Sequence, residues 1–340
     1  MTYHKFFRIL ASTAILGVLT GCMSGSDGGG GTSLETIAPL AGMTEEQYSK
    51  LQARGVVAKD GVPTRFTSVA STRTSGSGFD EPVGREEGSL TFRSGEEQGG
   101  VVTRNPTVTL TVNDLTGDAV SFHPRYDQSK NSLGRPVVSG SPGDVNGKKI
   151  YLGRRTQNLR HTAVVYLPRG DGHMYVGGYA SDIQGLRWSH GVFGRETTPD
   201  EVRALHGSAT FNGVGAATVN YLKSDEGEGG GFYEGNTSAT VNFVNNTYVM
   251  DGNFTGKSVA PFEALPFTMS SSGKINPDGS MTGTVTYGGL DAVKSTINGD
   301  VDGHLFGPGG QSIGATFIGH GNDASDNYVN IVGHAVLNRN

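Results

Sequence analysis

One pattern in this sequence matches the nucleophile motif of a hydrolase. Gly310-Gln311-Ser312-Ile313-Gly314 has the form G-x-S-x-G, and Asp323, Asp326 and His334 follow it in hydrolase order. A hydrolase serine lies on a sharp strand-to-helix turn, which exposes its hydroxyl and aims backbone N–H groups at the oxyanion. The residues after Ser312 are instead typical of a strand. We therefore interpret the motif as a hairpin turn and predict that the protein is not an enzyme.

A second segment resembles the start of a calcium-binding loop. Asn298, Asp300 and Asp302 supply oxygen atoms at the first, third and fifth positions, and Gly303 stands at the sixth. A complete loop also needs a bidentate carboxylate at its last position. That position is Gly309. We therefore predict a strand with acidic side chains facing outward, and no metal site.

The histidines raise the question of haem. The chain contains nine, and none has the H-x-H or H-E-x-x-H spacing of metal ligands. His304, His320 and His334 fall in the last predicted strands and could converge at one mouth of a barrel. Axial ligation of haem needs only one or two histidines in an apolar pocket. These three are kept as candidate ligand-binding residues with haem as a candidate cofactor, and solvent-facing strand positions are the alternative.

Two other features are typical of a partner-binding surface. One segment gathers four aromatic residues, namely Tyr175, Tyr179, Trp188 and Phe193. A surface aromatic cluster is typical of a partner hot spot, and Trp188 is the candidate contact among these residues; packing between sheets is the alternative. The acidic, glycine-rich segment 225–231 supplies Glu226 and Glu228 as further candidates, because recognition is often carried by loops on a rigid scaffold.

The N-terminus predicts a lipid anchor. A basic start precedes the apolar run Ile9–Leu19, which is too short to span a bilayer. The run closes with Leu19-Thr20-Gly21-Cys22, which is typical of a bacterial lipobox and contains the only cysteine of the chain. We predict cleavage before Cys22 and lipidation of its thiol; a secretory signal with a chance cysteine is the alternative. Met23 is not the aspartate that retains lipoproteins at the inner membrane, which favours the outer membrane.

Composition narrows the class of partner. The formal net charge is −5, and it becomes −7 once Lys5 and Arg8 leave with the signal peptide. This balance argues against binding of nucleic acid or a basic-patch contact with a membrane. A single cysteine leaves no disulfide within the chain, so stability must come from buried sheet faces.

The predicted organisation has five parts. They are a signal peptide (1–21), a flexible Gly/Ser-rich tether (22–43), a short helix with loops (44–100), a smaller β-rich domain (101–206) and a C-terminal domain (207–340). Thr44 and Gln47 have capping-box spacing, and Gly55 stands where that helix would end. Thr198-Pro199-Asp200-Glu201 is a second capping box, which predicts a short helix over Pro199–Leu205.

The C-terminal domain shows strand periodicity throughout. Ser208–Phe211 and Ala216–Leu222 open a series of about eight strands, mostly in hairpins. A series of this size with one alternating apolar face favours a closed barrel whose interior is filled by side chains. The predicted fold class is therefore all-β, with a C-terminal eight-stranded antiparallel β-barrel behind a smaller β-rich region; an open β-sandwich is the alternative.

Several motifs in this domain resemble those of the transferrin-binding protein B-like barrels. Gly303-His304-Leu305-Phe306-Gly307-Pro308 followed by Ile313-Gly314-Ala315-Thr316-Phe317 resembles the family's C-terminal signature. In this signature we expect a structural role for Gly303, Phe306, Gly307, Pro308 and Gly314. Gly207–Gly213 resembles the first barrel strand, and Val241–Gly256 resembles the central hairpin. The resemblance covers about 207–340 of this chain and agrees with the lipobox.

The resemblance implies a lipid-anchored, surface-exposed protein of the bacterial outer membrane, in which a handle sheet often precedes the barrel. Relatives capture host iron carriers, haem, haemoglobin or complement regulators, some of them beside a TonB-dependent transporter. The transferrin binder has two handle-plus-barrel lobes, whereas this chain has room for one. We therefore predict a non-enzymatic binding protein for a host or environmental ligand. The alternative is an envelope-structural or adhesion lipoprotein with no small-molecule ligand.

Overall fold

The computed structural model is built almost wholly from strands. It describes residues 49, 52–73, 80–93, 96–98, 101–104, 107–113, 116–122, 148–156, 159–167, 175–183, 187–223, 227–256, 266–289, 297–322 and 328–340. The signal peptide, the tether and the capping box at Thr44 lie outside these residues. None of the helices within the described ranges combines the length and the apolar character needed to cross a membrane.

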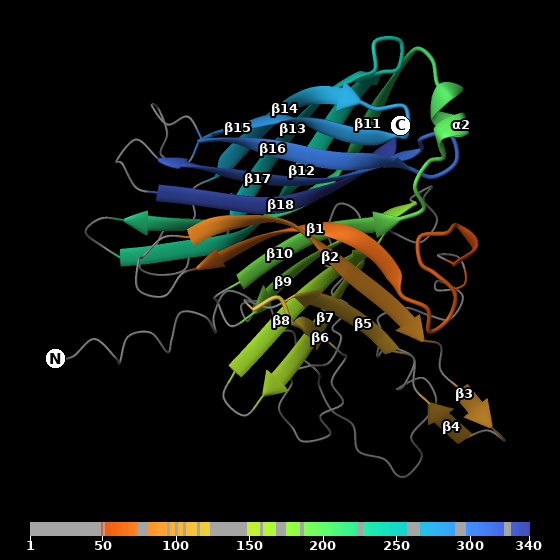
Figure 1. The fold of residues 1–340 in the computed structure, drawn as a ribbon, viewed down its shortest axis with the longest axis vertical. Coiled ribbons are helices and arrows are strands. Elements are labelled where there is room, and N and C mark those ends of the chain that lie inside the picture. The colour runs from red at the N-terminus through yellow and green to blue at the C-terminus, as the bar shows by residue number, and fades with distance from the viewer. Residues whose placement is uncertain are drawn as a thin grey trace, which may run out of the picture.

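The N-terminal half forms one sheet, here called the handle, whose strand order is β6-β5-β2-β1-β10-β9-β8-β7 (Figure 1). Its strands are β1 (Thr64–Arg73), β2 (Asp80–Arg93), β5 (Thr107–Asn113), β6 (Ala119–Phe122), β7 (Lys148–Thr156), β8 (Leu159–Leu167), β9 (Val176–Ile183) and β10 (Arg187–Gly194). A separate pair, β3 (Glu96–Gln98) and β4 (Val101–Arg104), stands apart from it.

The handle begins earlier in the chain than the sequence patterns predicted. The sequence predicts loops with one or two strands over 56–100 and regular strands from Val101, yet β1 and β2 already lie near the middle of the sheet. The reason is that the middle of β1, Ser68–Ser71, is buried on both faces and mixes serines with Val69 and Ala70. Ser68 and Ser71 are 1% and 0% exposed, so the strand lacks the apolar alternation by which a half-buried strand is recognised.

The C-terminal half is a closed barrel of eight antiparallel strands in chain order, which confirms the predicted fold class. They are β11 (Ser208–Lys223), β12 (Gly227–Asn242), β13 (Thr247–Gly256), β14 (Phe267–Ile275), β15 (Ser280–Gly288), β16 (Ile297–Phe306), β17 (Ser312–Asn322) and β18 (Tyr328–Arg339). The barrel closes where β11 pairs with β18 along twelve residue pairs. The first two predicted strands are one continuous strand, β11.

Side chains fill the barrel interior. On β13 every second residue is buried, which is the alternation expected of a strand with one face inward. The ring of Phe254 stacks on that of Phe267 with centroids 4.7 Å apart, and Phe317 meets Phe254 edge-on at 5.8 Å. Tyr233, Tyr248 and Tyr287 are buried beside them. This filling is the expected outcome for a barrel of eight strands.

The short helix α2 (Pro199–Arg203) lies between the two sheets in sequence, as predicted. The Thr198 hydroxyl accepts from the Glu201 N–H, and the Glu201 carboxylate accepts from the Thr198 N–H at 2.8 Å. This second bond is the first cause of the lowered pKa of Glu201. Gly55, the predicted stop of the first helix, has a φ of 73° and donates to the Gln52 carbonyl.

Candidate functional site at the seam between handle and barrel

The outer face of barrel strands β11, β17 and β18 is covered by β1, β2, β9 and β10 of the handle (Figure 1). We call this contact the seam. Strand β18 shows its effect, because Val329 to Leu337 is buried without alternation. Inward-facing residues of β18 fill the barrel, and outward-facing ones meet the handle. One apolar group of the seam is formed by Val176, Phe306 and Val336, and Ala180 meets Ala216 in a second.

The C-terminal signature residues build one end of the seam. A Cβ on Gly314 would lie 2.7 Å from both Phe306 and Val176, so only glycine lets these side chains meet over β17. Gly307 has a φ of 79°, and a Cβ there would lie 2.4 Å from the Tyr175 ring. Pro308 follows in the same turn, and Gly303 lies against the backbone of β17. The signature residues therefore lie where the barrel and the handle are in contact.

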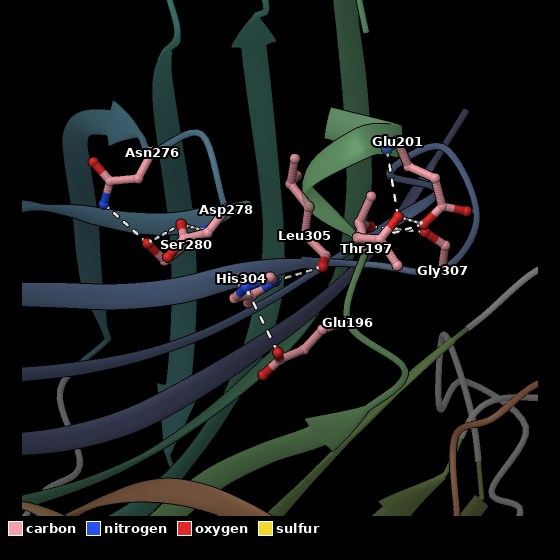
Figure 2. Close-up of polar contacts among 10 residues, drawn as sticks. Glu196, Thr197, Glu201, Asn276, Asp278, Ser280, His304, Leu305 and Gly307 are labelled. Carbon is pink, nitrogen blue, oxygen red and sulfur yellow. Dashed lines mark hydrogen bonds and ion pairs between the residues drawn. The ribbon is translucent and has the colours of Figure 1, made fainter. Parts of the chain in front are cut away.

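The segment that connects handle to barrel is fastened at this same end (Figure 2). The Thr197 N–H donates to the Leu305 carbonyl at 2.8 Å, and the Thr197 hydroxyl donates to the Gly307 carbonyl at 2.7 Å. The Gly307 N–H donates back to the Arg195 carbonyl at 2.7 Å. These bonds tie the start of the connection to the barrel, so handle and barrel are held together beside α2.

The three candidate histidines do not converge. His304 lies near α2, where its Nδ1 donates to the Leu305 carbonyl at 2.7 Å and its Nε2 is 3.8 Å from the Glu196 carboxylate (Figure 2). His304 pairs in register with Gly314, and His320 lies six residues further along β17, about 20 Å at the rise of a strand. His320 is exposed, and His334 is 1% exposed in the seam. The predicted convergence at a barrel mouth is therefore wrong.

His334 instead meets a histidine that the sequence analysis did not single out. Its Nδ1 lies 3.1 Å from Nδ1 of His190 on β10, and Nε2 of His190 lies 2.9 Å from the Thr218 hydroxyl. Burial lowers the pKa of His334 to about 3. Burial and the neighbouring His334 lower the pKa of His190 well below its usual value. Both rings are therefore neutral at pH 7. Within the described residues, no group of three metal-ligating side chains is present.

Trp188 lies at the opposite end of the seam from α2. Its side chain is partly exposed, and it pairs in register with Ser71 on β1 and Asp182 on β9. The Ser71 hydroxyl accepts from the Asn330 amide at 2.7 Å. Asn330 pairs in turn with His320, so Trp188 and His320 flank the same end of the seam. Strands β1, β9, β11 and β17 all terminate there, and we call this the loop end.

The other acidic and aromatic candidates have different positions. Glu226 lies outside the described residues, and Glu228 pairs with Leu222 where β11 and β12 meet near the loop end. Tyr179 and Phe193 are buried in the handle core against Phe66, with ring centroids 5.0 and 5.8 Å away. These two rings therefore pack inside the handle core, whereas the alternative drawn from the sequence was packing between sheets.

The motif with Ser312 runs from the turn at 307–310 into the start of β17, and the segment from Asn298 to Gly303 lies within β16. Ser312 is 0% exposed at the start of β17; its hydroxyl donates to the Asn338 side chain at 2.9 Å and accepts from the Tyr175 N–H at 3.3 Å. Asp323 and Asp326 lie outside the described residues. Asn298 and Asp300 are exposed on β16, as the interpretation of outward-facing acids predicted. Asp302 forms an ion pair across the seam with Arg85 of β2.

Comparison with solved structures finds matches of low identity and low TM-score. Transferrin-binding protein B from Haemophilus parasuis matches with 9% identity and a TM-score of 0.37, over 84% of this chain and 77% of that one. The haemoglobin receptor HpuA from Kingella denitrificans matches with 13% identity and a TM-score of 0.37, over 84% and 89%. Transferrin-binding protein B from Neisseria meningitidis matches with 13% identity and a TM-score of 0.37, over 84% of this chain and 78% of that one.

Two of these matches are transferrin-binding protein B, the family that the C-terminal motifs resemble. No family model matches the sequence, and no curated protein matches it.

Proposed function

We propose that this protein is a lipid-anchored outer-membrane protein that captures a ligand at the cell surface through the loop end of the seam. The observation that carries the proposal is the position of Trp188. It is the only tryptophan of the chain, and it is partly exposed where four strand ends from both bodies gather. Tryptophan in such a position is typical of an interface hot spot.

The filled barrel supports a surface site rather than an enclosed one. Aromatic side chains such as Phe254, Phe267 and Tyr233 occupy the barrel interior. A large ligand would therefore be contacted by strand ends and loops on a rigid support. The lipobox at Cys22 and the glycine-rich tether after it support a protein held at the membrane by its lipid and extended away from it.

Binding is tested with the full chain immobilised on a surface. Human haemoglobin, transferrin and haem are the first probes, because relatives in the family whose motifs this chain resembles capture ligands of these kinds. We expect one of them to bind saturably. Trp188→Phe, measured by surface immobilisation, is expected to weaken binding about tenfold or more, as hot-spot truncations do. Val244→Ala, which changes a 71% exposed side chain at another hairpin, is the matched control.

Location is tested separately by protease treatment of intact cells that carry a tag after Asn340. Loss of the tag with periplasmic markers intact would support surface exposure. A tag that becomes sensitive only after lysis would contradict it and would favour an envelope-structural role. Crosslinking on the same cells tests the expected TonB-dependent transporter, which would be recovered with the tagged protein.

A further inference from the structure

The buried histidine pair joins two bodies that supply one ring each. His190 comes from the handle and is 0% exposed; His334 comes from the barrel and is 1% exposed. The His190 ring is inserted among barrel side chains, with the Thr218 hydroxyl at one nitrogen and the Phe232 ring stacked at 6.3 Å. A pair of this kind forms only when handle and barrel are in contact.

The geometry fixes how many protons the pair can hold without penalty. Two Nδ1 atoms 3.1 Å apart share one proton, because one ring must donate and the other accept. A second proton between them would set two N–H groups against each other. The ring that accepts at Nδ1 is neutral because it carries its own proton on Nε2. A further proton on Nε2 of the donating ring would turn it into an imidazolium and place a positive charge in a buried site.

The charged side chains on the strands packed around the His190–His334 pair are separated from it by other residues or strands. Asp182 on β9 lies two residues from Ala180, which pairs with His190. Glu234 on β12 and Asp302 on β16 each lie two strands from His334, and Arg85 of β2 pairs with Asp302. The shifted pKa values accordingly have burial as their main cause, with the partner ring as the further cause for His190.

We propose that His190 and His334 form an acid-sensitive latch, which holds the seam closed at neutral pH and releases its loop end on acidification. The hydrogen bonds of Arg195 and Thr197 to the barrel keep the end beside α2 attached, so this connection is the hinge. The loop end, with Trp188 and the Ser71–Asn330 contact, is the part that separates. The inference concerns the fold and does not depend on which ligand the protein binds.

The direction of the effect follows from proton linkage. Both histidines have a lower pKa in the closed seam than in water, so the open state binds more protons. The closed state is fully favoured above the ordinary histidine pKa, and the fraction of closed molecules decreases as the pH falls below that value. Each histidine that takes up a proton reduces the ratio of closed to open molecules about tenfold per pH unit in that range.

The test uses quenching of Trp188 fluorescence by acrylamide in the full chain, from about pH 8 to about pH 5. Because Trp188 is the only tryptophan, the signal reports the loop end alone. We expect a roughly twofold rise in the quenching constant on acidification, with unchanged far-ultraviolet circular dichroism. The double variant His190→Gln/His334→Gln should lose this pH response. His206→Gln, an exposed histidine beside α2 and away from the loop end, is the matched control and should keep it.

Three results would overturn the latch: a flat profile in the wild-type chain, loss of circular dichroism at the same pH as the quenching change, or an unchanged profile in the double variant. If the double variant does not fold, the latch is tested by amide hydrogen exchange of the wild-type chain at neutral and acidic pH. The exchange rates are corrected for the intrinsic pH dependence of amide exchange. Faster exchange at acidic pH in β9, β10 and β18 with no change in β13–β15 supports the latch. A uniform change across both sets contradicts it.

Discussion

Gly178 of the handle lies directly against the imidazole ring of His334 in the barrel. A Cβ built on Gly178 would lie 2.4 Å from Cδ2 and 2.5 Å from Nε2 of that ring. The close approach of β9 to β18 therefore depends on a residue without a side chain. The missing side chain of Gly178 also leaves the space that the His334 ring occupies between the two sheets.

Gly178→Ala is expected to force the seam apart locally. Overpacking of a buried contact typically costs about 1–3 kcal/mol. Urea unfolding followed by circular dichroism measures the change. Gly288→Ala on β15 is a suitable control, because the nearest atom to its added methyl is the Thr268 hydroxyl at 3.0 Å, the end of an exposed side chain. Equal losses in the two variants would contradict the role of Gly178.

Phe254→Ala should be among the most damaging single changes in the barrel. Phe254 is 1% exposed and contacts the rings of Phe267 and Phe317. Removal of a buried phenylalanine costs about 3–5 kcal/mol through lost burial and the cavity left behind. Val249→Ala on the same strand, where the side chain is 49% exposed, should change the free energy of unfolding little. A mild effect of Phe254→Ala would mean that the interior is not packed as described.

Thr198→Ala should destabilise the chain by about 1 kcal/mol, the usual value of a lost helix N-cap. The substitution removes the hydroxyl that accepts from the Glu201 N–H. Thr198→Ser keeps that hydroxyl and should be close to neutral. Thermal unfolding of the wild-type chain and the two variants measures the difference. If Thr198→Ser lost as much stability as Thr198→Ala, the methyl group of Thr198 would matter more than its capping hydroxyl.

Alkaline pH should unfold the protein through its buried tyrosines. Burial raises the pKa of Tyr179 and of Tyr287 well above the usual value near 10, so the folded state holds their protons more tightly than the unfolded state does. Their contribution to stability is complete below pH 10 and is lost as the pH rises beyond it. Absorbance of tyrosinate should therefore appear in two stages, with a late stage that coincides with loss of circular dichroism. In Tyr287→Phe that late stage should be smaller.

The sequence by itself determined the barrel and the short helix. Alternating strands such as β13, the turn before Ser280 and the capping box at Thr198 are local signals, and each agrees with its neighbours along the chain. The signature around Phe306 and Gly307 is also a local pattern, and it predicts a structural role. These features depend on residues a few positions apart, for which spacing alone predicts geometry.

Only the tertiary structure decided where the seam lies and what is buried in it. Ser71 and Asn330 are 259 residues apart, and His190 and His334 are 144 residues apart, so no local pattern links them. The outer face of β18 looks like an ordinary strand face until the handle covers it. Its histidine and asparagine are buried because a second sheet packs there, and that long-range contact gives the His190–His334 pair its shifted pKa values.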